Sequence, residues 1–156
     1  MTRAILTFIL IFSLATKAFS AACPDLSGRY RLRGEDGYVI IDIKQMNCTS
    51  LEVSRESNYL GQITRTKLLI KSDGIFRWVY GGLYAAKEAY MIAGHFIGDG
   101  FEIRSIPAFS SKSKKGAMSL VEVYSTDSQG NLRLTHKSYD AAGNLKSEST
   151  VVAVRV

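Results

Sequence analysis

The chain of 156 residues has only two histidines and two cysteines, the residue types that most often bind metals or act as nucleophiles. It also has only two prolines and one tryptophan. A structural zinc site takes four cysteine or histidine ligands, so these few residues argue against one. The sequence also lacks a Gly-x-Ser-x-Gly nucleophile elbow and a glycine-rich phosphate loop. We therefore predict a protein that is not an enzyme and uses no metal or cofactor. The enzymatic alternative is a pair of carboxylates drawn from Glu88, Glu102 and Glu122.

Neither sign of charge dominates, since 20 lysines and arginines face 14 aspartates and glutamates, for a net charge of +6. This mild excess falls short of what a dedicated nucleic-acid-binding protein carries, and we predict no nucleic acid partner. One cluster of cations lies in the serine-rich stretch 107–116 and comprises Lys112, Lys114 and Lys115. It is typical of a solvated loop, with contact to an anionic membrane surface as the alternative.

The first 22 residues have the pattern of a secretory signal peptide. Arg3 gives a basic start, residues 4–15 are apolar or small, and small residues suit cleavage after Ser20 or Ala22. The apolar run is shorter than the roughly 20 residues that a membrane-spanning helix needs. We expect an exported protein, periplasmic or extracellular, with residues 23–156 as a single domain.

The two cysteines, Cys23 and Cys48, both follow the predicted signal peptide. In an oxidising compartment an even pair predicts one disulfide, here closing a loop of about 25 residues. Cleavage after Ala22 would instead allow Cys23 to be acylated as in a lipoprotein. Ser20, however, stands where such a signal has a large aliphatic residue.

Turn signals that set Asp or Asn beside Gly recur along the chain, and Asp-x-x-Gly-Asn-Leu occurs twice, from Asp127 and from Asp140. Between the turns, apolar and polar residues alternate with the period of two that is typical of antiparallel strands. The strands are predicted near 27–33, 38–46, 49–55, 63–71, 75–80, 88–97, 101–106, 117–125, 131–139 and 145–155. Helical spacing within 83–93 indicates one short helix as an alternative there.

These elements predict an all-β fold, an antiparallel meander of about eight to ten strands. Open sheet edges invite aggregation, so we expect the meander to close into a β-barrel.

Aromatic side chains provide the main functional lead. Phe76, Trp78 and Tyr80 share one face of a predicted strand, and Tyr84 and Tyr90 follow. A barrel of about eight or more strands can hold one small molecule, and we expect these five residues to line such a cavity. The alternative is an ordinary hydrophobic core. His136 falls on the apolar face of its strand with Leu132 and Leu134, which predicts a hydrogen-bonded interior histidine.

The segment Leu26-Ser27-Gly28-Arg29-Tyr30 resembles the opening strand of the lipocalin-like (calycin) barrels, which begin with a Gly-x-Trp element. Tyr30 stands in the place of the tryptophan, and Tyr124-Ser125-Thr126-Asp127 is similar to a Thr-Asp-Tyr element on a late strand of that family. The resemblance implies a meander barrel that carries a small hydrophobic ligand.

Three functions remain open from the sequence. The first is an exported, non-catalytic β-barrel that binds a small apolar or aromatic molecule in its interior. The second is an eight-stranded outer-membrane barrel. The third is a secreted protein–protein interaction or inhibitor module. Nothing in the sequence indicates one oligomeric state over another.

Overall fold

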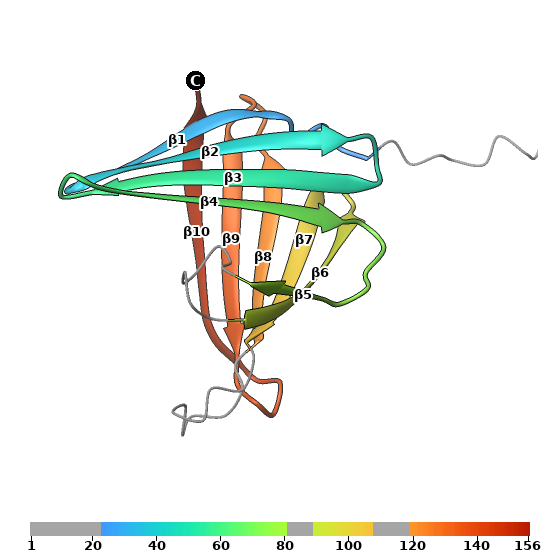
Figure 1. Ribbon diagram of the computed structural model, residues 1–156. Helices are drawn as coiled ribbons and strands as arrows, with labels where there is room; N and C mark the ends of the chain where they lie inside the picture. The colour runs from blue at the N-terminus through green and yellow to red at the C-terminus, as the bar shows by residue number, and fades with distance from the viewer. Residues whose placement is uncertain (1–22, 81–88, 108–118) are drawn as a thin grey trace, which may run out of the picture.

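The computed structural model describes residues 23–80, 89–107 and 119–156, and all of its regular structure there is β-strand (Figure 1). Within these ranges no helix is long and apolar enough to cross a membrane. The strands are β1 (Gly28–Gly34), β2 (Gly37–Met46), β3 (Ser50–Tyr59), β4 (Gln62–Lys71), β5 (Arg77–Tyr80), β6 (Ala89–Ile97), β7 (Gly100–Pro107), β8 (Ser119–Thr126), β9 (Leu132–Tyr139) and β10 (Leu145–Arg155).

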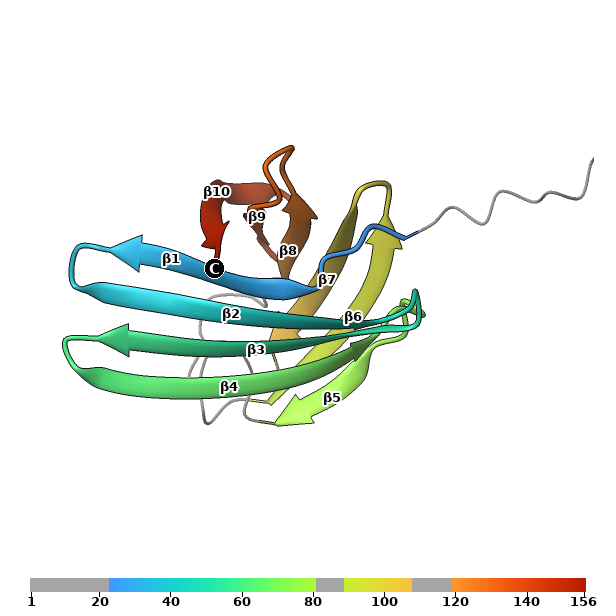
Figure 2. The ribbon, with the colours of Figure 1, turned by 90° about the horizontal axis from the view of Figure 1, so that it is seen from above.

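All ten strands belong to one antiparallel sheet in the order β4-β3-β2-β1-β10-β9-β8-β7-β6-β5. Strands that are consecutive in sequence are therefore neighbours, except at β4 and β5, and the first strand also pairs with the last. That seam is short, with Tyr30 opposite Arg155 and Arg31 opposite Val154. From it β1–β4 and β6–β10 run in crossing directions, so the sheet folds over on itself (Figures 1 and 2).

The expected closure of the barrel is wrong, because the sheet is an open half-barrel whose two ends are β4 and β5. The end of β4 packs across β6 instead of pairing with β5. A Cβ atom on Gly94 in β6 would lie 2.4 Å from Cγ2 of Ile70 in β4, so glycine permits this close approach. The backbone N–H of Gly74 then donates to the carbonyl of Gly94 at 2.9 Å. β5, with four residues, leaves little edge with which to close the gap.

The predicted strands are confirmed as β1–β10, with boundaries shifted by a few residues. The helix predicted near 83–93 is wrong for residues 89–93, which belong to β6, and residues 83–88 lie outside the described part of the chain. Tyr90 and Ile92 are both 4% exposed and lie in the core on one face of the strand. This packing at a period of two overrides the helical propensity of the neighbouring alanines.

The core lies between the two crossing halves of the sheet and includes three fully buried aromatic residues, Tyr30, Phe101 and Tyr124. The hydroxyl of Tyr30 donates to the carbonyl of Leu26 at 3.0 Å. A Cβ on Gly28 would come within 2.9 Å of that hydroxyl, so the Gly-Arg-Tyr sequence lets the ring turn back over its own strand. The segment before β1 thereby packs over one end of the core.

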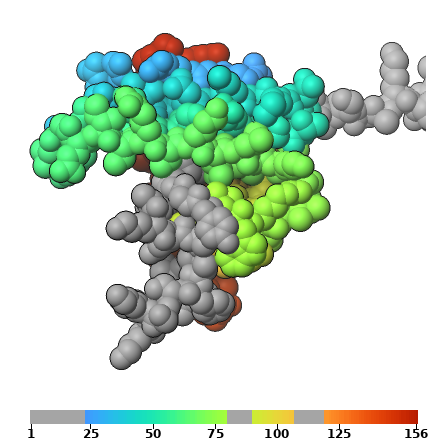
Figure 3. Space-filling view, viewed as in Figure 1, coloured from blue at the N-terminus to red at the C-terminus, as the bar shows by residue number. Residues whose placement is uncertain are grey.

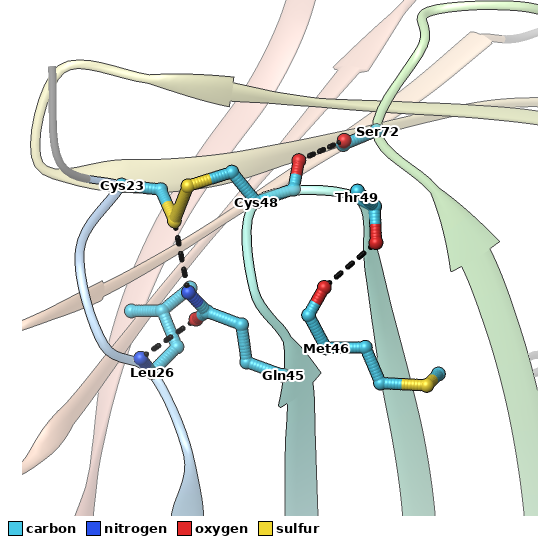
Figure 4. Close-up of a disulfide and its surroundings, with 7 residues drawn as sticks. All are labelled: Cys23, Leu26, Gln45, Met46, Cys48, Thr49 and Ser72. Carbon is cyan, nitrogen blue, oxygen red and sulfur yellow. Dashed lines mark hydrogen bonds between the residues drawn. A yellow bond between two sulfur atoms is a disulfide. The ribbon is translucent and has the colours of Figure 1, made fainter. Parts of the chain in front are cut away.

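The predicted disulfide is confirmed, because Cys23 and Cys48 are bonded with their Cα atoms 5.6 Å apart (Figure 4). Gln45 reinforces the link, since its Nε2 donates to Sγ of Cys23 at 3.2 Å and its Oε1 accepts from the N–H of Leu26 at 3.0 Å. Ser72 donates to the carbonyl of Cys48. The start of the domain is thus attached to the turn between β2 and β3. A disulfide is compatible with export to an oxidising compartment; the predicted signal peptide, residues 1–22, lies outside the described residues.

Candidate functional site

The inner face of the half-barrel changes from apolar to polar partway along its strands. On β3, Leu51 and Val53 are fully buried, and the next inner residue is Arg55. Across the interior, β8 presents Tyr124 and Glu122 on its inner face, and β9 presents His136. These four polar side chains meet where the core ends, and we call them the inner polar network.

Glu122 is the centre of the inner polar network. Nη2 of Arg55 donates to Oε1 and Oε2 of Glu122 at 3.1 and 3.0 Å, and also to the hydroxyl of Tyr124. That hydroxyl donates to Oε2 of Glu122 at 3.0 Å. Nδ1 of His136 lies 3.0 Å from Oε1, as follows from the direct pairing of Glu122 with His136 between β8 and β9. The guanidinium carbon of Arg55 also lies 5.9 Å from the centre of the Tyr124 ring.

Exposure differs sharply across the network. Glu122 is 1% exposed, whereas the side chains of Arg55 and His136 are 14% and 38% exposed. A buried carboxylate needs a counter-charge and hydrogen-bond donors, which Arg55, Tyr124 and His136 provide. Burial and, secondarily, the charge of Glu122 raise the pKa of Tyr124, so its hydroxyl remains a donor at neutral pH.

The arrangement also orients the imidazole of His136. In the neutral ring, Nδ1 carries the proton when it donates to Glu122, and Nε2 then has a lone pair. The ring is the most exposed of the three side chains around Glu122. Its Nε2 is therefore the atom of the network best suited to accept a hydrogen bond from a bound molecule.

Sequence reasoning found only part of this network. The alternation in 131–139 placed His136 on the inner face with Leu132 and Leu134, and the structure supplies its partner. Arg55 was missed, although it continues the inner series of Leu51 and Val53. The suggested carboxylate pair does not form from Glu122 and Glu102, because Glu102 lies opposite Val123 on the outer face. Glu88 is outside the described residues.

The five aromatic residues predicted to line a cavity do not share one wall. Trp78 pairs with Met91 and is 57% exposed on the outer face, and Phe76 is 37% exposed. Tyr90 pairs with Val79 and is buried in the core. Tyr80 ends β5, and Tyr84 lies outside the described residues.

A groove of about 580 Å³ lies on the outer face of the half formed by β5–β9. Its lining residues alternate with core residues, as Val121 and Val123 do with Glu122 and Tyr124. Apolar and aromatic side chains line most of it, and the charged ones are Glu102, Arg104 and Lys137. Arg104 is paired with Glu102 at 2.5 Å, so the groove is mainly an apolar surface with neutralised charge.

Across the described ranges, no three His, Cys, Asp or Glu side chains come together in a group that could hold a metal ion. The lysine cluster of residues 112–115 lies outside those ranges. The chain matches no family model, no curated protein and no solved structure.

Proposed function

We propose that the protein is an exported, non-catalytic binding protein for a small apolar or aromatic molecule that carries a hydroxyl group. The ligand lies on the inner face of the half-barrel, with its hydroxyl at His136. The observation that carries this proposal is the inner polar network, a carboxylate-oriented imidazole at the boundary between a packed core and an accessible inner face.

The inner polar network supports a hydroxyl-bearing ligand because it includes an exposed hydrogen-bond acceptor, Nε2 of His136. An ion pair that only stabilises the fold needs no such acceptor. Arg55 and Tyr124 already satisfy Glu122 with donors. His136 adds a third partner and is 38% exposed, which makes it accessible from the inner face. Ligand pockets commonly combine an apolar lining with a few such fixed polar groups.

Apolar surface for the rest of the ligand lies next to the network. Leu32, Val39 and Val151 pack against the core but are only partly buried. Val39 is the next inner residue on β2 after Ile41, which pairs with Arg55. A ligand that covered these side chains would remove apolar surface from water, which contributes about 25 cal/mol per Å².

The open sheet favours this function over an outer-membrane barrel. A sheet within lipid must be closed, because unpaired backbone N–H and C=O groups cost several kcal/mol each in hydrocarbon. Here β4 and β5 end the sheet without pairing to each other.

The second candidate function is a protein–protein interaction module that uses the outer groove. Phe76 borders the groove, and Trp78 is exposed on the same face. Exposed aromatic residues are typical of such interfaces.

The first test is a native mass spectrum of the protein purified from its own host, in which a carrier retains a non-covalent adduct. The second compares binding of 2-naphthol and 2-methylnaphthalene, measured by the change in ligand fluorescence. One hydrogen bond contributes about 1 kcal/mol, so we expect a roughly fivefold preference for the naphthol. His136→Phe should abolish that preference. The matched variant His95→Phe should retain it, because His95 of β6 pairs with Glu102 on the outer face. An unchanged preference in His136→Phe would refute the proposed site.

A further inference from the structure

The outer surface around the seam between β1 and β10 is rich in arginine and exposed valine. On β1, Arg29, Arg31 and Arg33 alternate with inner residues, and Arg31 pairs with Val154 of β10. On the other side of β10, Val152 pairs with Arg133 of β9. We call this surface the arginine–valine face, and it comprises Arg29, Arg31, Arg133, Val152, Val154 and Val156.

The valines of this face are unusually exposed for β-branched residues in a strand. Val152, Val154 and Val156 are 44%, 57% and 60% exposed. Val156 continues past β10 and donates its N–H to the carbonyl of Arg29 at 2.9 Å, so Val154 and Val156 lie beside β1, while Val152 lies beside Arg133 of β9. Figure 2 shows the C-terminal end of β10 next to β1.

The positive charge of the face is only partly neutralised. Asp42 lies 3.7 Å from Nε of Arg29, and both side chains are largely exposed, at 42% and 56%. Asp127 interacts with the charge of Arg133, but its carboxylate is occupied by the N–H groups of Gln129 and Asn131 in the turn between β8 and β9.

Arg31 and Arg33 form no ion pair with any carboxylate of residues 23–80, 89–107 or 119–156. Arg31 therefore contributes a positive charge to the face that no carboxylate of the described residues neutralises.

We propose that the arginine–valine face docks on the surface of an anionic lipid membrane. Guanidinium groups bind phosphate in a bidentate manner and keep their charge at any physiological pH. A soluble polyanion would use the arginines but would leave the valines in water. A membrane surface offers headgroup phosphates for the arginines and the edge of the acyl region for the valines. A second copy of the chain fits poorly, because its own arginines would repel these.

Docking in this manner leaves the inner face accessible. The side chains of the inner polar network lie on the opposite face of the sheet from the arginine–valine face. The membrane proposal thus stands whether or not the inner face binds a ligand.

Co-sedimentation with vesicles tests the proposal, using protein purified after export so that any signal peptide has been removed. We expect binding to vesicles of phosphatidylcholine mixed with phosphatidylglycerol, little binding to pure phosphatidylcholine, and weakening by salt. Each arginine near an anionic surface is worth roughly a fivefold change in partitioning. Arg31→Gln with Arg133→Gln should therefore weaken binding by more than tenfold, and Val152→Ser with Val154→Ser by several fold.

The matched control is Arg65→Gln with Lys67→Gln, which removes the same charge from the outer face of β4, where both side chains are exposed. Figure 3 shows β4 (green) along the surface on this side of the molecule. The control should change vesicle binding by less than about twofold.

Three results would overturn the proposal. The first is failure of the wild-type protein to bind the anionic vesicles. The second is an equal loss of binding in the control. The third is a pair of observations: the valine variant binds vesicles as well as the wild type does, and inorganic polyphosphate displaces both proteins from the vesicles. That result would assign the face to soluble polyanions.

Discussion

Removing the guanidinium from the inner polar network by Arg55→Leu should destabilise the protein strongly. The substitution leaves the carboxylate of Glu122, 1% exposed, without its cationic partner. Breaking a buried ion pair by removing one partner typically costs 3–5 kcal/mol. His136 and Tyr124 still donate to Glu122, so we expect a loss of about 3 kcal/mol in the free energy of unfolding. Urea denaturation followed by far-ultraviolet circular dichroism measures it.

The loss in Arg55→Leu should also depend on pH. Without the guanidinium, burial raises the pKa of the Glu122 carboxyl in the folded state above the value of about 4.3 in the unfolded chain. The folded variant then holds its proton more tightly than the unfolded chain does. Its stability relative to the wild type therefore falls as the pH rises from about 4.3 through the folded-state pKa.

Two comparisons make this prediction refutable. Lys67→Leu breaks the exposed ion pair of Lys67 with Glu52 and should cost no more than about 1 kcal/mol. Adding Glu122→Leu to Arg55→Leu removes the buried charge and should recover at least half of the loss, since apolar replacements of buried ion pairs are often tolerated. If Arg55→Leu costs less than about 1 kcal/mol and the cost is the same at pH 5 and pH 8, the assignment of Glu122 as a buried charge is wrong.

Three further predictions concern the frame around the site. Cys23→Ser with Cys48→Ser should lower the free energy of unfolding by about 3 kcal/mol, measured by urea denaturation against the oxidised wild type, and a reducing agent should then have no further effect. Gly94→Ala should cost about 1–3 kcal/mol, because the new methyl group would meet a side chain of β4 at 2.4 Å; thermal unfolding that matches the wild type would contradict the crossing of β4 over β6. Hydrogen bonds from the N–H and side chain of Asn144 hold the pKa of Asp140 at about 2, so its contribution to stability is present above about pH 4 and is lost as the pH falls towards 2. Acid unfolding of Asp140→Ala should lack that component.

The strands could be predicted from the sequence because their signals are local. The repeated turns at Asp127 and Asp140 form as expected, each aspartate accepting N–H bonds from residues two and four positions later. The failure of the barrel to close could not be predicted, because it depends on Ile70 of β4 meeting Gly94 of β6. No periodicity within one strand reports such a contact.

The candidate site was less accessible to sequence reasoning than the fold. Arg55 and Glu122 are separated by 67 positions and meet across the interior, so neither strand reveals the other. Alternation predicts that Phe76 and Trp78 share one face, but alternation alone does not say which face points inward. The pairing of Val79 with the buried Tyr90 shows that Val79 faces the core, which places Trp78 on the outer face.

The seam between β1 and β10 also has a consequence for the order in which the chain folds. Each other strand pairing joins segments close in sequence, but this one joins residue 30 to residue 155. A chain made from its N-terminus can form the hairpins of β1–β4 and of β6–β9 early, yet the seam that joins the two halves of the sheet needs β10, the last strand. The contact of highest sequence separation therefore forms last and slows folding. Until β10 is in place, no pairing between the described strands joins β1–β4 to β5–β9.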